Sequence, residues 1–418
     1  MSLSIKNIPS DWELKNLGEI GETYSGLSGK TKVDFGRGKP YITYMNIYSN
    51  PKLKIDFTDF VEINKSENQN SVKYGDIFFT TSSETPDEVG MSSVLLNKVD
   101  ELYLNSFCFG FRMFNFNTLL PEYAVYLLRG EKSRKIISIL AQGSTRFNLS
   151  KITLLKRLTL ALPPLKEQQK IAEILSTVDA KISIIDEQIS ENQNLKKGLM
   201  QSLLSKGIGH TEFKKSALGE IPKSWEVVKI QDIADVNKES LANSTDKNYE
   251  LFYIDLSSVK SGVIDLPTEK IKFSDAPSRA RRKIKKDDVI MATVRPNLLG
   301  YGYIDFKEND YFVSTGFVVL SYKENFNGRF LYQYLYSEVM QLQIEKLIVG
   351  SSYPAINSSD VKHMKIPLPP LQEQQKIASI LNSVDEKLGV LSEKKSYYQN
   401  LKKGLMQQLL TGKVRVSV

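Results

Sequence analysis

The sequence predicts an α+β protein in which two similar globular α/β domains are separated by a long antiparallel two-helix coiled coil, as an internal repeat with a pseudo-twofold axis. The first observation behind this prediction is a duplication. Residues 162–182 and 368–388 are identical at 15 of 21 positions, and the octapeptide NLKKGLMQ at 194–201 returns unchanged at 400–407. Both pairs have an offset of 206 residues, so each half of the chain ends in the same segment.

The second observation is the spacing of apolar residues within the repeated segment. Pro163-Pro164 and Pro369-Pro370 bias the preceding backbone to an extended conformation, since proline cannot lie inside a helix. Apolar residues then alternate in steps of four and three, which is the spacing of a helix that packs on another helix. The predicted inter-helix seam comprises Ile171, Leu175, Val178 and Ile182 in the first copy, and Ile377, Leu381, Val384 and Leu388 in the second. Each helix should run for about 40 residues, or about 60 Å.

The two long helices are predicted to pack against each other in opposite directions. An apolar stripe of this length needs a partner in water, and the other copy offers the same stripe. Because the second globular domain lies between the helices in the chain, the second helix should run back toward the first domain. Two unrelated core helices are the alternative, but they would leave the near-identity of the segments unexplained.

Each half opens with the same motif and continues with a similar order of elements. Residues 8–20 match residues 221–233, and the only two tryptophans, Trp12 and Trp225, fall at equivalent positions, where each should pack on its globular core. β-Branched and aromatic runs then predict strands, followed by a helical pattern. These strands and helices are Tyr41–Ile47, Asp76–Thr81, Phe107–Phe114 and Pro121–Leu140, then Leu251–Leu256, Asp288–Val294, Tyr311–Leu320 and Phe330–Ile348. We therefore place globular domains at 1–165 and, with a linker, 208–370, and long helices at 166–207 and 371–418.

Composition narrows the class of protein. The 418 residues are 41% hydrophobic and 25% charged, which is ordinary for a soluble globular chain. The net charge of +8 permits nucleic acid or an anionic membrane as a partner without choosing between them. No apolar run reaches the roughly 18 residues of a membrane span. The single cysteine, Cys108, excludes an internal disulfide and favours a reducing, cytoplasmic location.

Two polar loops recur at matched positions in the halves. The first loop follows an Asp-containing strand and carries Thr81, Ser82 and Ser83 in one half, and Thr293, Arg295 and Asn297 in the other. The second precedes the Pro-Pro segment and carries Arg146 and Asn148, and then Tyr353. Such side chains hydrogen-bond base edges and phosphates, although Ser, Thr and Asn are also ordinary turn residues. Their matched recurrence favours a DNA-binding role.

A basic run occurs in the second half alone. RARRKIKK at 279–286 contains Arg279, Arg281, Arg282 and Lys283, and the corresponding region of the first half lacks it. This run fits either an edge that contacts phosphates or a solvated surface segment.

Signals of catalysis are largely absent. The two histidines, His210 and His363, lack the partners of a metal site or a catalytic triad. SGLSGKT at 25–31 resembles a phosphate-binding loop, but Tyr24 occupies the position of its first glycine. No Gly-rich cofactor fingerprint and no Asn/Asp-Pro-Pro-aromatic tetrapeptide is present. The sequence therefore predicts a non-catalytic binding protein without a metal, a cofactor or a small-molecule substrate.

Taken together, these motifs resemble the specificity subunit of type I restriction–modification systems. The resemblance rests on LPPL-x-EQQKIA followed by a long helix ending in NLKKGLMQ, twice in one chain. It implies two target-recognition domains, each reading one half of a split, asymmetric site in double-stranded DNA, and two helices that set the spacer between the half-sites. It further implies docking of two methyltransferase subunits, which methylate adenine N6, and of endonuclease/translocase subunits in a larger complex.

Other readings of the same scaffold remain open. A stand-alone DNA-binding regulator or architectural factor would bind without partner subunits. A pure assembly scaffold would bind protein through its globular halves and show no salt-dependent affinity for DNA. An enzyme that acts alone is the least compatible with the sequence.

Overall fold

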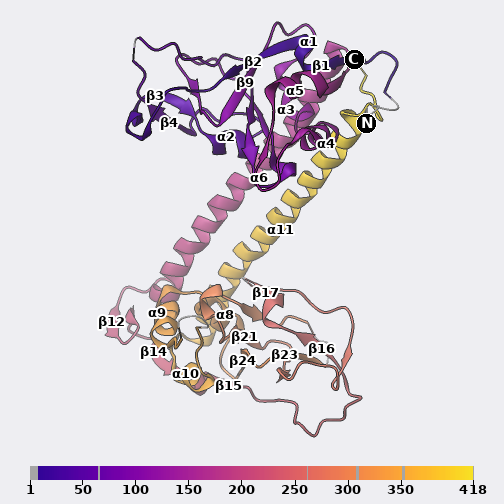
Figure 1. Ribbon diagram of the computed structural model, residues 1–418. Helices are drawn as coiled ribbons and strands as arrows, with labels where there is room; N and C mark the ends of the chain where they lie inside the picture. Colours follow the sequence, from indigo (N-terminus) through magenta and orange to yellow (C-terminus); the bar gives the residue numbers. More distant parts are fainter. Residues whose placement is uncertain (1–7, 65, 261, 307–309, 351–353, 418) are drawn as a thin grey trace. The chain divides into compact units, whose positions relative to one another are not determined.

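The computed structural model describes residues 8–417 except 65, 261, 307–309 and 351–353. The chain divides into two compact units. Unit 1 comprises Met1–Asp186 and Glu393–Val418, and unit 2 comprises Glu187–Ser392. The predicted fold class is confirmed, because two α/β units alternate along the chain with two long helices, α6 (Leu165–Lys206) and α11 (Leu371–Leu409) (Figure 1).

Unit 1 is built on a four-stranded antiparallel sheet in the order β2-β9-β5-β7, beside a three-stranded sheet in the order β4-β3-β8. These strands are β2 (Gly21–Ser25), β3 (Phe35–Ile42), β4 (Thr58–Val61), β5 (Ile77–Thr80), β7 (Ser92–Val94), β8 (Tyr103–Leu104) and β9 (Cys108–Met113). Two short pairs, β1 (Glu13–Asn16) with β11 (Thr159–Leu162) and β6 (Ser82–Ser83) with β10 (Phe147–Asn148), complete the strands. The helices are α1 (Leu17–Ile20), α2 (Tyr44–Ser49), α3 (Pro121–Leu127), α4 (Glu131–Leu140) and α5 (Lys151–Arg157).

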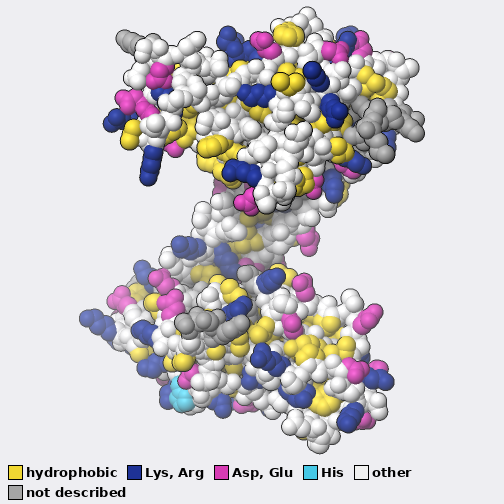
Figure 2. Space-filling model, in the orientation of Figure 1, with side chains coloured by type: hydrophobic (Ala, Val, Ile, Leu, Met, Phe, Trp, Pro, Cys, Tyr) yellow, Lys and Arg dark blue, Asp and Glu magenta, His cyan; other side chains and the backbone are white. Residues whose placement is uncertain are grey.

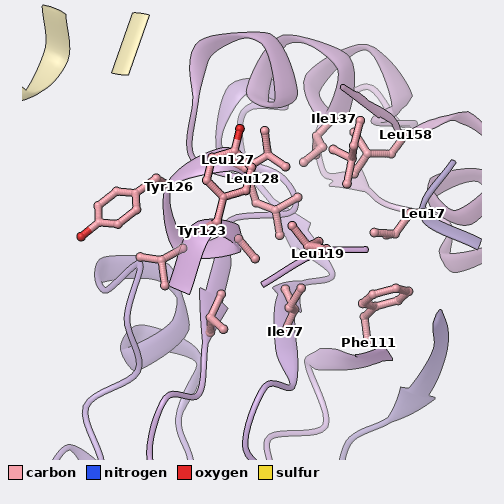
Figure 3. Packing of buried hydrophobic residues seen from close by; sticks show 14 of the residues in the cluster. Leu17, Ile77, Phe111, Leu119, Tyr123, Tyr126, Leu127, Leu128, Ile137 and Leu158 are labelled. Carbon is pink, nitrogen blue, oxygen red and sulfur yellow. The ribbon is translucent and has the colours of Figure 1, made fainter. Parts of the chain in front are cut away.

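The main core of unit 1 lies between this sheet and helices α3 and α4. Figure 3 shows Tyr123 and Leu127 of α3 and Ile137 of α4 over Ile77 and Phe111 of the sheet, all of them buried. Tyr126 points away from this cluster, and its hydroxyl donates to Asp179 of α6 over 3.0 Å. Helix α3 therefore packs on the sheet with one face and contacts the long helix with another.

Unit 2 repeats this plan. Its antiparallel sheet has the order β15-β24-β21-β22 and its second sheet the order β19-β16-β23-β20, in which β16 and β23 are parallel, as β3 and β8 are in unit 1. The strands are β12 (Phe213–Ser216), β13 (Gly219–Pro222), β14 (Glu226–Lys229), β15 (Ala234–Val236), β16 (Glu250–Ile254), β17 (Val259–Lys260), β18 (Val263–Ile264), β19 (Ile271–Lys272), β20 (Ala280–Lys283), β21 (Val289–Ala292), β22 (Tyr301–Tyr303), β23 (Tyr311–Ser314), β24 (Phe317–Tyr322) and β25 (Lys365–Leu368). The helices are α7 (Ile230–Ile233), α8 (Gly328–Leu335), α9 (Glu338–Leu347) and α10 (Ser358–His363).

Four predicted segments are shortened or split in the structure. The strand expected at Tyr41–Ile47 ends at Ile42, because the Thr43 side chain accepts from the Asn46 N–H and caps α2. Tyr311–Leu320 is two strands, β23 and β24, separated by a turn at Thr315-Gly316. Both helical patterns are also split, the first between α3 and α4 and the second between α8 and α9.

Within each unit, one end of α6 packs beside the opposite end of α11, so the predicted antiparallel pairing is confirmed locally. In unit 1, Leu409 of α11 shares a hydrophobic cluster with Ile171 of α6. In unit 2, Leu204 of α6 shares one with Ile377 of α11. Ion pairs reinforce both contacts, at 2.6 Å for Lys402 with Asp179 and 2.6 Å for Lys196 with Asp385. The two ion pairs are related by the 206-residue offset.

The repeated Glu-Gln pair fixes the first turn of each long helix. The Trp12 indole donates to the Glu167 carboxylate over 3.2 Å, and the Trp225 indole donates to Glu373 over 2.9 Å. Trp12 and Trp225 are buried, as predicted. A buried carboxylate needs partners because desolvation penalises its charge. Glu167 obtains a second one in Arg415, which follows α11.

The glutamine next to this glutamate joins two backbone segments. Gln168 donates to the carbonyls of Thr118 and Pro163, both over 2.8 Å, and accepts the N–H of Leu120, which precedes α3. Gln374 donates to the Pro369 carbonyl and accepts the Asn327 N–H, which precedes α8. The repeated motif therefore ties the start of each long helix to the start of a domain helix.

Replacing Gln168 with Ala should destabilise unit 1 by about 3 kcal/mol, because one buried and two half-buried backbone groups lose their partner. Gln169 is the matched control: it is exposed, and its replacement with Ala should cost less than about 0.5 kcal/mol. Denaturant unfolding of the full chain measures both values, and equal effects of the two substitutions would contradict the role of Gln168.

Candidate functional site

In unit 1, the two recurring loops lie side by side. Ser82 and Ser83 form β6, which pairs with Phe147 and Asn148 of β10. The Leu149 N–H also donates to the carbonyl of Thr81. We call these segments, Thr81–Ser83 and Phe147–Leu149, loop pair 1. Arg146 and Asn148 are exposed, whereas Ser82 is buried and Thr81 and Ser83 are half-buried.

Loop pair 1 borders a cavity of about 550 Å³. Its lining includes Ser82, Ser83 and Arg146, which the sequence had singled out, and Tyr44, Tyr48, Glu88 and Phe107, which it had not. Tyr44 and Tyr48 stack with a centroid distance of 6.0 Å, and Phe107 is 63% exposed. The cavity therefore combines aromatic faces, one guanidinium and the carboxylates of Glu84 and Glu88. Sequence reasoning missed Tyr44 and Tyr48 because they lie on α2, which was expected to be a strand.

Unit 2 brings its two loops together in the same way. Val294 bridges to Ala355, the Arg295 N–H donates to the Pro354 carbonyl, and the Ile356 N–H donates to the Thr293 carbonyl. We call Thr293–Arg295 and Pro354–Ile356 loop pair 2. Arg295 and Asn297 are exposed, but Thr293 is buried and its hydroxyl donates to the Gly316 carbonyl. Tyr353, a predicted DNA-binding residue, lies outside the described residues.

The turn after loop pair 2 has an unusual backbone. A 3-10 turn, η4 (Pro296–Leu298), is flanked by Arg295 at φ 51° and Leu299 at φ 52°. Residues other than glycine rarely adopt this left-handed backbone conformation, which costs them about 1–2 kcal/mol each. Strain of this kind concentrates at functional sites. The turn presents Arg295, Asn297 and Leu298 to solvent.

The basic run lies on β20, whose neighbours connect it to loop pair 2. The Thr315 N–H donates to the Arg279 carbonyl, and Thr315 precedes Gly316, the partner of Thr293. Arg282 approaches the Ser358 hydroxyl at 3.5 Å, two residues after the loop pair. Arg279 is exposed, whereas Arg281, Arg282 and Lys283 are half-buried. Arg281 lies over the Phe273 ring at 4.5 Å.

A second kind of site occurs once in each unit, as a groove beside a long helix. The groove in unit 2 has a volume of about 750 Å³ and lies between α6 and the connection from α8 to α9. The groove in unit 1 has a volume of about 650 Å³ and lies between α11 and the helices α3 and α4. Five lining residues of one groove recur identically in the other at the 206-residue offset. These are Gln193, Lys196, Lys197, Met200 and Gln201 in unit 2, and Gln399, Lys402, Lys403, Met406 and Gln407 in unit 1.

Six of the eight predicted seam residues are buried. Ile171, Leu175, Ile377 and Leu381 have no exposed surface, and Val178 and Val384 are 8% exposed. Ile182 and Leu388 are half-buried. The helices are thus most enclosed over their first three turns, where a globular unit also covers them.

Within the described residues, no group of three or more His, Cys, Asp or Glu side chains could hold a metal ion. None of the described helices is both long and apolar enough to cross a membrane.

Cys108 is buried in the sheet of unit 1, and burial raises the pKa of its thiol to about 12. On the visible face of unit 1, Lys and Arg are interspersed with Asp and Glu (Figure 2).

Comparison with known families identifies the repeat. The family model described as "Type I restriction modification DNA specificity domain" matches residues 9–193 and again residues 222–396. The chain is 33% identical to the putative type I restriction enzyme MjaX specificity subunit of Methanocaldococcus jannaschii, over 99% of this chain and 96% of that protein. It is 28% identical to the type I restriction enzyme MjaVIII specificity subunit of the same organism, over 98% of this chain and 94% of that protein.

Solved structures share the fold. The S subunit of a type I restriction-modification system from M. genitalium superposes with a TM-score of 0.58 at 16% identity, over 97% of this chain and 98% of that one. A chain from a structure of complex assembly and conformational transition of the type I R-M system superposes with a TM-score of 0.56 at 18% identity. The match covers 98% of this chain and 100% of that one.

The strain at Arg295 can be measured by comparing two substitutions. Arg295→Gly should be more stable than Arg295→Ala by about 1 kcal/mol, because glycine adopts positive φ without steric cost. Both variants lose the arginine side chain, so the comparison isolates the backbone. Denaturant unfolding gives the difference, and an alanine variant as stable as the glycine variant would show that the turn is unstrained.

Proposed function

Because the chain belongs to the specificity-subunit family of type I restriction–modification systems, we propose that it directs such a complex to a split, asymmetric site in double-stranded DNA. Residues 1–165 and 208–370 are the proposed target-recognition domains. Each reads one half-site through its loop pair.

The observation that carries this proposal is the pairing of the same two loops at the same place in both units, with different side chains. Loop pair 1 offers Ser83, Asn148 and the adjacent Arg146, and loop pair 2 offers Arg295 with Asn297 nearby. Arginine suits the O6 and N7 acceptors of guanine, and asparagine suits adenine. A common scaffold with unlike loops supports the reading of two unlike half-sites.

The basic run of unit 2 is proposed to contact phosphates, with Arg279 as its exposed predicted position. Phosphate contacts position a protein on DNA without carrying sequence information. Residues 166–207 and 371–418 are the proposed spacer helices, because a rigid connection between two readers determines the spacing of their half-sites.

The matched grooves support docking of two copies of one partner. Identical lysine, methionine and glutamine side chains line both grooves, so one partner surface fits both. We assign them to the two methyltransferase subunits of the complex, which carry the adenine N6 methylation that this chain does not perform. Endonuclease/translocase subunits join the same assembly in the cytoplasm, where the chromosome lies.

Selection from randomised double-stranded DNA tests this function. The full chain, mixed with the methyltransferase subunit of its host, should enrich two short motifs separated by a fixed unread spacer. Recovery of one uninterrupted motif, or of none, would contradict the proposal, and equal enrichment without the methyltransferase would favour a stand-alone DNA-binding protein.

A second arm of this experiment tests the spacer. Inserting the same seven residues after Ser190 and after its equivalent Ser396 keeps the heptad pattern in both helices. It should lengthen the spacer by about three base pairs, since seven residues add about 10 Å of helix and a base pair rises about 3.4 Å. Changed half-sites with an unchanged spacer would contradict the role of the helices.

A further inference from the structure

A short 3-10 turn follows the first loop of each loop pair, and its last residue differs in chemistry between the units. The turn is η2 (Pro86–Glu88) in unit 1 and η4 (Pro296–Leu298) in unit 2. Both turns begin with proline, and a glycine, Gly90 or Gly300, follows two residues after each. The matched last residues are a carboxylate, Glu88, and an apolar side chain, Leu298, which is 64% exposed.

Glu88 is held in a fixed orientation at the edge of the unit 1 cavity. Its Oε1 accepts from the Tyr48 hydroxyl over 2.7 Å, and its Oε2 accepts from the Ser83 hydroxyl over 3.0 Å. The Thr85 side chain is a third hydrogen-bond partner, and because a carboxylate has about four acceptor positions, one is left for a ligand. Hydrogen bonds from Tyr48, Ser83 and Thr85 lower the pKa of Glu88 below its usual value, so the side chain is ionised at neutral pH.

The surroundings of Glu88 indicate a ligand with both a flat apolar surface and a hydrogen-bond donor. The cavity is also lined by Tyr44, by the exposed Phe107 and by Arg146. Across the part of the chain that the structure describes, Glu88 forms no ion pair, although it lines the cavity. The nearby guanidinium of Arg146 would offset repulsion between this carboxylate and DNA phosphates.

We propose that Glu88 is a specificity-determining residue of unit 1 that accepts a hydrogen bond from the N4 amino group of a cytosine in the first half-site. This inference rests on the proposed function and names the base that one side chain reads. A carboxylate can only accept hydrogen bonds when ionised, so it requires a donor on the base edge.

The other three bases fit this carboxylate less well. In the major groove, guanine presents two acceptors and thymine presents an acceptor and a methyl group, so both would oppose the charge. Adenine has an amino group, but its N7 acceptor lies beside it. Cytosine alone presents a donor without a neighbouring acceptor on its own edge. Leu298, at the matched position, can form no hydrogen bond.

Selection from randomised DNA with Glu88→Gln and Glu88→Ala tests the proposal, under the conditions in which the unaltered chain enriches its split motif. Both variants should lose a cytosine preference of about tenfold to a hundredfold at one position of one half-site. Gln offers a donor beside its acceptor and should shift that position toward adenine, whereas Ala should leave it unselective. The other half-site should be unchanged.

Two further variants distinguish loss of base recognition by Glu88 from a general effect of a substitution on the structure. Leu298→Gln should leave the first half-site unchanged, which controls for changes elsewhere on the chain. Tyr48→Phe removes one hydrogen bond that orients Glu88 but keeps the carboxylate, so it should weaken the preference for cytosine without shifting it to another base. The proposal is overturned if Glu88→Gln selects the unaltered motif, if the changed base is not cytosine, or if both Glu88 variants weaken binding equally on all sequences. Failure of the unaltered chain to enrich any split motif would instead contradict the proposed function.

Discussion

The hydrogen bonds at the first turn of each long helix are the contacts on which the rest of the structure depends. A glutamate that accepts from a tryptophan indole, and a glutamine that joins two backbone segments, attach α6 to unit 1 and α11 to unit 2. The partner that completes each carboxylate comes from the chain beyond the other long helix, Arg415 for Glu167 and His210 for Glu373. Each unit therefore needs the start of one long helix and the end of the other.

The duplication made the architecture predictable from one sequence. Identity between two copies marks residues with a shared task, so the long helices, the antiparallel pairing and the buried tryptophans followed from it. The ends of individual strands and helices were harder to predict from the sequence. Thr43 acts as a helix cap only because the structure turns there, and Thr315-Gly316 interrupts a run that reads as one strand. Glu88 and Tyr48 meet only in the folded unit, and nothing in their local sequence indicated it.

Identical and dissimilar residues are distributed according to function. The long-helix side of the two grooves keeps the same side chains in both units, as one partner bound twice would require. The loop pairs and the turns after them keep their backbone pairing but differ in side chains, with Glu88 where the second unit has Leu298. Under the proposed function, altering the turns would change the DNA site while the helix faces proposed for assembly stay constant.

Cross-linking of paired cysteines tests the antiparallel pairing most directly. In a Cys108→Ala chain, one variant carries cysteines in place of Asp179 and Lys402, another in place of Lys196 and Asp385, and a control in place of Asp179 and Lys196. A short bis-maleimide should link both matched pairs within one chain, because each replaces an ion pair of 2.6 Å. The control pair, about 25 Å apart on one helix, should not react. Linking of neither matched pair would contradict the account.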